Sequence, residues 1–281
     1  MNIPQAKAPF VRAPRRSFGF SVVEILVAVS IMTMIVFGLY KMFDQTQRAL
    51  RSNITQSDVL ESGRSAIDLL SREMEQMTAS RMTAGTNFMT RLAALPEVPL
   101  VQSISATGEE RTNLLNDVFF ITRQGNKTSA VGYRVLNATN GVGTLGRFSF
   151  TLHTSLVNPT NLVRAFVNAA PTNFQRIADG VVHFKVTPYD AQGRRVQFNL
   201  EINRLYSVPE PRVPTEFAIA YVNQTMPSQV ELELGYLEPP VADQAKSLPN
   251  RDAARRFLEK QAGKIHLFRH RIPIRTSSQT Q

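Results

Sequence analysis

The sequence has no cysteine in its 281 residues. Disulfide bonds and cysteine-ligated zinc or iron–sulfur sites are therefore excluded. The absence does not fix a compartment, but it suits an exported protein, because such a chain offers no thiol to unwanted oxidation.

Acidic residues are missing from the first 19 positions, where Lys7, Arg12, Arg15 and Arg16 contribute a charge of +4. From Lys246 to the end, nine basic residues face two acidic ones and contribute +7, so the rest of the chain carries −1 of the total of +10. The chain is therefore not uniformly basic. Its two ends carry the charge, which weakens a general nucleic-acid interpretation.

Proline is absent between Pro14 and Pro96, which leaves room for a long helix. Residues 20–40 are 21 residues with a single charge, Glu24, and they show no polar face. As a helix they extend about 30 Å, the thickness of a bilayer's hydrocarbon core. We therefore predict a transmembrane helix at 20–40, with the basic N-terminus in the cytoplasm and the C-terminal part exported. No A-x-A-like cleavage site closes the apolar run, which argues against an ordinary secretory signal.

The run RRSFGFSVVEILVAVSIM resembles the leader and first helix of type IV prepilins and type II secretion pseudopilins. In that family a prepilin peptidase cuts after the glycine, the new N-terminal phenylalanine is N-methylated, and a glutamate at the fifth mature position guides assembly. The resemblance assigns these roles to Gly19, Phe20 and Glu24. Residues 1–19 are then a leader peptide.

Glu24 also has a physical reason to seek a partner. A carboxylate inside a bilayer costs on the order of 2.5–3.5 kcal/mol. The amine freed at Phe20 lies about one helical turn away, and the same amine on a neighbouring subunit is the other candidate. A glutamate tolerated near the headgroups is the alternative without function.

The helical pattern continues past the membrane, because Leu60, Ile67, Leu70, Met74 and Met77 recur at three- or four-residue steps with one skipped position. This stripe predicts a helix from Phe20 to about Met82, with Gly85 as its stop. Residues 41–84 are therefore expected to be a stalk that continues into a folded head, and the methionines to be core residues rather than a cofactor site.

Residues 85–281 are predicted to form the head, with a connecting region over 86–116 and strands beyond it. Alternating strand patterns occur at 182–186, 196–203 and 230–234, and further strand candidates are 117–123, 130–136, 147–153, 162–167, 215–222 and 264–274. Short runs of this kind form an antiparallel sheet with one face buried on the helix. The expected fold class is α+β, a long N-terminal helix on an antiparallel sheet.

This plan is similar to that of pilins, and the size exceeds that of filament-shaft subunits. The stretches DVFFITRQGNKTSAVGYRV, IADGVVHFKVTPYDAQG and PSQVELEL resemble the J-type minor pseudopilin of type II secretion or its W-type relative in type IV pili. The resemblance implies a structural subunit near the tip of a periplasmic filament, anchored in the bacterial inner membrane. Its partners would be other minor and major pilin-like subunits, the prepilin peptidase that cuts it, and membrane lipid.

No catalytic residue, metal, cofactor or small-molecule substrate is expected. Gly141–Gly146 spells G-x-G-x-x-G, but a strand-like run follows it, so a loop between strands is predicted instead of a dinucleotide site. His266 and His270 fall in a predicted strand, too far apart for one metal. Glu231 and Glu233 are expected on a solvated strand face.

The basic C-terminal stretch predicts a short helix over RDAARRFLEKQAGK, followed by a strand. Its cations are expected to be solvated, with membrane headgroups, an acidic subunit or DNA as alternative contacts. Three other functions stay open: a single-span anchor for an unrelated exported domain, a DNA-uptake pilin that binds through these arginines, and an anchored enzyme.

Overall fold

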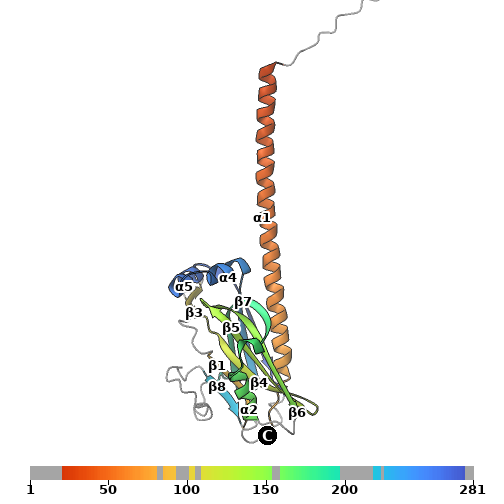
Figure 1. Ribbon diagram of the computed structural model, residues 1–281, viewed down its shortest axis with the longest axis vertical. Coiled ribbons are helices and arrows are strands. Elements are labelled where there is room, and N and C mark those ends of the chain that lie inside the picture. Colours follow the sequence, from red (N-terminus) through yellow and green to blue (C-terminus); the bar gives the residue numbers. More distant parts are fainter. Residues whose placement is uncertain are drawn as a thin grey trace, which may run out of the picture. The chain divides into compact units, whose positions relative to one another are not determined.

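The computed structural model describes residues 21–80, 85–92, 101–104, 109–153, 159–196, 218–222 and 225–275 (Figure 1). The chain divides into two compact units, Met1–Asn53 and Ile54–Gln281, and we call the second unit the head. The elements in chain order are α1 (Val22–Glu75), β1 (Thr86–Leu92), β2 (Val101–Ile104), β3 (Glu109–Thr112), β4 (Asn116–Gln124), β5 (Lys127–Thr139), β6 (Val142–His153), α2 (Pro159–Val167), η2 (Pro171–Asn173), β7 (Gln175–Tyr189), β8 (Ala218–Val222), β9 (Gln229–Leu237), α4 (Pro239–Lys246), α5 (Arg251–Lys260), η4 (Ala262–Lys264) and β10 (Ile265–Pro273).

The predicted long N-terminal helix is confirmed, and it has 54 residues. It ends at Glu75 rather than near 82, so the predicted stop at Gly85 is wrong. The reason is that the amides of Gln76 and Met77 bond three residues back, to Glu73 and Met74, and Met77 then pairs with Thr122 of β4. The last turn of α1 therefore has hydrogen bonds that span three residues, and the chain pairs with β4 directly after it.

Eight strands form one sheet in the order β10-β9-β7-β6-β5-β4-β1-β8, and β2 and β3 form a separate hairpin. Every pairing between named strands is antiparallel, as predicted. The expectation of a connecting region over 86–116 is wrong, since β1 pairs with both β4 and β8. Phe88 and Met89 of β1 are both buried, in different clusters, so this strand lacks the alternation that marks a half-exposed strand.

The strand predicted at 162–167 is wrong, because these residues belong to helix α2. Pro159 opens the helix, a position that proline favours. Leu162, Val163 and Phe166 then share one helical face and are completely buried. The strands predicted at 117–123, 130–136, 147–153, 182–186, 230–234 and 264–274 are confirmed, β8 covers the second half of 215–222, and 197–203 lies outside the described residues.

Both faces of the sheet are covered within the head. One face packs against residues of α1 beyond Ile54, among them Val59, Leu70 and Met74. The other face is covered by α2 over one cluster and by α4 and α5 over another. Figure 1 shows α4 and α5 together at one end of the sheet. The head is therefore an α+β structure with a continuous sheet between helical layers.

Strand β7 changes partners along its length. Its first part pairs with β6 as far as Val181, and its second part pairs with β9. Gly180, with a φ of 77°, lies at the change, a conformation that favours glycine. Beyond Gly180, Phe184 of β7 forms a parallel bridge with Leu115, which directly precedes β4. The sheet is therefore curled, because it brings β7 next to the segment before β4 although β6 and β5 stand between them in the strand order.

Gly132 of β5 gives a test of this packing. A Cβ atom there would lie 2.4 Å from the ring of Phe166, which is completely buried. We expect Gly132→Ala to lower the free energy of unfolding by about 1–3 kcal/mol, because the packed ring cannot move away freely. Urea unfolding in detergent measures this, and adding Phe166→Leu should recover part of the loss. An alanine variant as stable as the parent would contradict the close packing.

Candidate functional site

The first half of α1 is a continuous apolar surface. From Val22 to Phe43, its large apolar side chains are between 49% and 80% exposed and lie on all sides of the helix. The most apolar 18-residue window has a mean hydropathy of 2.5, and none of it is buried. The helix is therefore long and apolar enough to cross a membrane.

Two hydroxyl side chains in this half form hydrogen bonds within the helix. The hydroxyl groups of Ser30 and Thr33 donate to the carbonyl oxygens of Leu26 and Val29, each at 2.8 Å. Such bonds let a hydroxyl lie in an apolar environment without an unpaired donor. The carboxylate of Glu24 makes no such hydrogen bond within the described part of the helix.

Glu24 lies in the first turn of α1 and is exposed. Its carboxylate makes no ion pair or hydrogen bond with any part of the chain that the structure describes, although the positive end of the helix dipole favours a carboxylate there. Gly19 and Phe20, the predicted cleavage residues, lie outside the described residues. Glu24 is thus a lone acid in an apolar surface, open to a partner from elsewhere.

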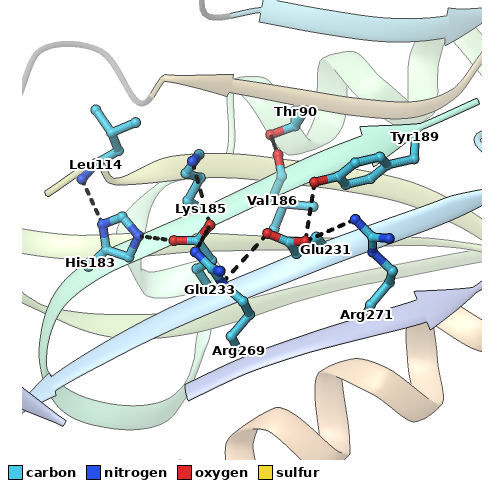
Figure 2. A network of polar contacts seen from close by, with 10 residues as sticks. All are labelled: Thr90, Leu114, His183, Lys185, Val186, Tyr189, Glu231, Glu233, Arg269 and Arg271. Carbon is cyan, nitrogen blue, oxygen red and sulfur yellow. Dashed lines mark hydrogen bonds and ion pairs between the residues drawn. The ribbon is translucent and has the colours of Figure 1, made fainter. Parts of the chain in front are cut away.

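A second polar cluster lies on the strands β7, β9 and β10, centred on Glu233 (Figure 2). Glu233 is 5% exposed, so the expectation of a solvated face is wrong for this residue. Its carboxylate lies 3.3 Å from Nε2 of His183, 3.5 Å from Nζ of Lys185 and 3.2 Å from Nη2 of Arg269. Hydrogen bonding to His183 and the charges of Lys185 and Arg269 lower the pKa of Glu233 to about 2, although burial opposes this.

The geometry also indicates the tautomer of His183. The amide of Leu114 donates to Nδ1 at 3.0 Å, so Nδ1 is unprotonated and Nε2 carries the hydrogen that faces Glu233. A neutral imidazole therefore links the segment before β4 to strand β9. Its two nitrogens are both occupied by structural contacts.

Glu231 extends the cluster along β9. Its carboxylate accepts from the hydroxyl of Tyr189 at 3.1 Å and from Arg271 at 3.3 Å, and Arg269 lies 3.6 Å away. The guanidinium of Arg271 also lies 4.2 Å above the ring of Tyr189. Glu231 is therefore paired as well, and each carboxylate is matched by cations from neighbouring strands.

These contacts tie three strands together and leave the cluster's charged groups engaged with one another. Among the described residues, no group of three or more His, Asp or Glu side chains could hold a metal ion. His266 and His270 lie in strand β10, as predicted. Of the G-x-G-x-x-G run only Gly141 is in a turn, because β6 begins at Val142, so the predicted loop is shorter than expected.

A third polar contact, which the sequence pattern did not predict, joins α1 to the sheet inside the head. Glu73 bonds to Arg147 of β6, with Nη2 2.7 Å from Oε1, and accepts from the hydroxyl of Tyr133 of β5. The sequence did contain an indication, since Glu73 stands between Leu70 and Met74 on the apolar stripe. A lone carboxylate on a buried face requires a partner.

The predicted C-terminal helix is confirmed as α5 followed by η4. Its cations are only partly solvated, since Arg255 pairs with Glu259 and Lys264 with Glu238. Arg256 and Lys260 are exposed and pair with no residue that the structure describes.

No protein-family model and no curated protein matches this chain.

Proposed function

We propose that this chain is a minor pilin-like structural subunit that assembles into a short periplasmic filament for type II protein secretion and helps to start its growth. The observation that carries the proposal is the two-part character of α1. Its first half is apolar on all sides with one lone carboxylate, Glu24, and its residues beyond Ile54 pack on an antiparallel sheet. A filament built from packed helices with folded heads needs both properties in one helix.

The lone carboxylate gives this helix a means of registering with its neighbours. After cleavage at Gly19, the methylated amine of Phe20 keeps its positive charge. Pairing of that amine with Glu24 of a neighbouring helix offsets the cost of a carboxylate in the membrane and sets the axial position of the two helices. Orientation follows from the basic leader, which keeps the N-terminus in the cytoplasm and places the head in the periplasm.

The head is fixed to its part of α1 by both packing and charge. Val59, Leu70 and Met74 lie in the core, and Glu73 bonds to two strands. Movement of residues 54–75 along the helix axis is therefore transmitted to the whole sheet. A subunit that is pushed outward by filament growth needs this connection.

Cleavage is the decisive experiment. The full chain is produced in membranes with and without a prepilin peptidase, and intact mass and the N-terminal peptide are measured. We expect a mature chain that begins at N-methylated Phe20 only when the peptidase is present. Gly19→Leu should block cleavage, whereas Gly38→Ala should not, since no atom lies within 4 Å of a Cβ added at Gly38.

An intact chain beginning at Met1 in both samples would overturn the proposal. The chain would then be a single-span anchor that carries an exported domain. If the chain is cut but does not copurify with other pilin-like subunits after crosslinking in membranes, the assembly role is wrong while the processing remains.

A further inference from the structure

The described part of the head contains a cavity of mixed polar and apolar lining that the proposed function does not use. It has a volume of about 500 Å³, within the range of small-molecule sites. Its lining comes from β5, β6, η2, the start of β7 and the last residue of α4, namely Leu136, Asn137, Thr144, Pro171, Thr172, Phe174, Arg176 and Lys246. The apolar residues supply part of the wall, and hydroxyl, amide and cationic groups supply the rest.

The charge of this cavity is positive. Lys246 makes no ion pair with a described residue, and Arg176 engages Asp179 only through Nη2, at 2.8 and 2.7 Å. The Arg176 side chain is 71% exposed, so its other N–H groups are accessible to a ligand from solution. Partial burial pushes the pKa of Asp179 upward, but bonds from Arg176 and Thr144 and the charge of Lys246 bring it below its ordinary value. The positive charges of Arg176 and Lys246 are therefore balanced by only one nearby carboxylate, that of Asp179.

The donors around the cavity match an oxyanion with several acceptors. Arg176 offers a planar fork and Lys246 a point charge, a combination suited to phosphate. The amide of Asn137 adds an uncharged donor on the same lining. Phe174 and Leu136 provide apolar contact for carbon atoms attached to such a group.

The cavity lies toward the end of the sheet at which α4 follows β9. Asn140, in the turn between β5 and β6, holds α4 there by donating to the carbonyl oxygens of Ala245 and Leu248. Strand β10 begins at this end, and Gly63 of α1 packs on its Phe268. Glu73, ten residues later, contacts Arg147 farther along the sheet. Within the head, α1 therefore runs from this end of the sheet toward Glu73.

We propose that this cavity binds a phosphate-bearing anion, such as the glycerol phosphate portion of an anionic lipid, through Arg176 and Lys246. The phosphate chemistry stands on the cavity alone. The proposal that the phosphate belongs to a lipid rests on the proposed membrane anchoring. Phosphate binding by the cavity and membrane anchoring can therefore be disproved separately.

The test uses the full chain in uncharged detergent micelles. Because the chain has no cysteine, Asn173→Cys, between the lining residues Thr172 and Phe174, carries a single environment-sensitive fluorophore. We expect saturable titration with sn-glycerol 3-phosphate and with inorganic phosphate. Replacing both cations, Arg176→Gln and Lys246→Gln, should weaken binding at least tenfold.

The matched control removes the same charge outside the cavity, by Arg256→Gln and Lys260→Gln on α5. These two residues are exposed, and we expect binding within twofold of the parent. Equal weakening by both double variants would overturn the proposal in favour of a diffuse cationic surface. Absence of saturation, or saturation by succinate alone, would overturn it too. Unchanged thermal unfolding of both variants shows that folding is not the cause.

Whether the bound phosphate comes from a lipid or from solution is tested in nanodiscs of phosphatidylcholine with and without phosphatidylglycerol. A fluorescence change only with phosphatidylglycerol, reversed by glycerol 3-phosphate, supports a lipid headgroup. Binding of the soluble phosphates in micelles without any change in nanodiscs supports a phosphate from solution. Both results uphold the cavity as the binding site.

Discussion

Glu73→Ala is expected to lower the free energy of unfolding by about 3 kcal/mol, because it breaks a mostly buried ion pair between α1 and the sheet. Glu73 of α1 makes polar contacts with two strands at once, Tyr133 on β5 and Arg147 on β6. The side chains of Glu73 and Arg147 are only 18% and 21% exposed. Removing the carboxylate leaves a cation and a hydroxyl without their acceptor in a place that water reaches poorly.

The electrostatics of this contact point in the same direction. Hydrogen bonding to Glu73 raises the pKa of Arg147 against the opposing effect of burial. Burial, and then the bond to Glu73, raise the pKa of Tyr133. Both partners are thus held in their protonated forms, which are the forms that donate to the carboxylate.

Urea unfolding of the full chain in detergent, followed by near-ultraviolet circular dichroism, measures the effect. The matched control is Glu75→Ala, which removes an exposed carboxylate two residues away and is expected to change stability by no more than about 0.5 kcal/mol. A double-mutant cycle with Arg147→Ala isolates the pair. Equal losses for Glu73→Ala and Glu75→Ala would contradict the contact.

Glu233 is expected to make the head sensitive to acid. Its pKa falls from 4.5 to about 2 on folding, chiefly because His183 donates to it, with further help from Lys185 and Arg269. A depressed carboxylate pKa stabilises the folded state above the unfolded value. The contribution is therefore complete above pH 4.5 and is lost as the pH falls toward 2. The shift corresponds to roughly 3 kcal/mol.

The measurement compares unfolding free energies of the parent and of Glu233→Gln between pH 6 and pH 2. At pH 6 the variant is expected to be less stable by roughly 3 kcal/mol, and the difference should shrink to a small remainder near pH 2, where about half of Glu233 is protonated in the folded state. Glu75→Gln serves as the control and should follow the parent throughout. A constant difference between parent and Glu233→Gln at all pH values would show that packing, and not ionisation, is what the substitution removes.

The sequence by itself determined the features that depend on local composition. The apolar run after the basic leader, the absence of proline up to Pro96, and the stripe from Leu60 to Met74 predicted the long helix. Alternation predicted β9 and the second half of β7, because each has one face toward α1 and a polar face opposite. The roles of Gly19, Phe20 and Glu24 also come from the sequence, and they remain predictions for the cleavage experiment.

Only the tertiary structure decided features in which distant segments meet. Strand β1 was missed because both its faces are buried, and α2 was taken for a strand because its apolar face depends on the sheet it covers. Glu233 was expected in solvent, since alternation shows which side a residue takes but not what lies across the neighbouring strand. The cations that surround it, the pairing of Glu73 with Arg147 and the cavity beside Lys246 all join residues remote in the chain. Their partners are set by strand order, and no local pattern encodes strand order.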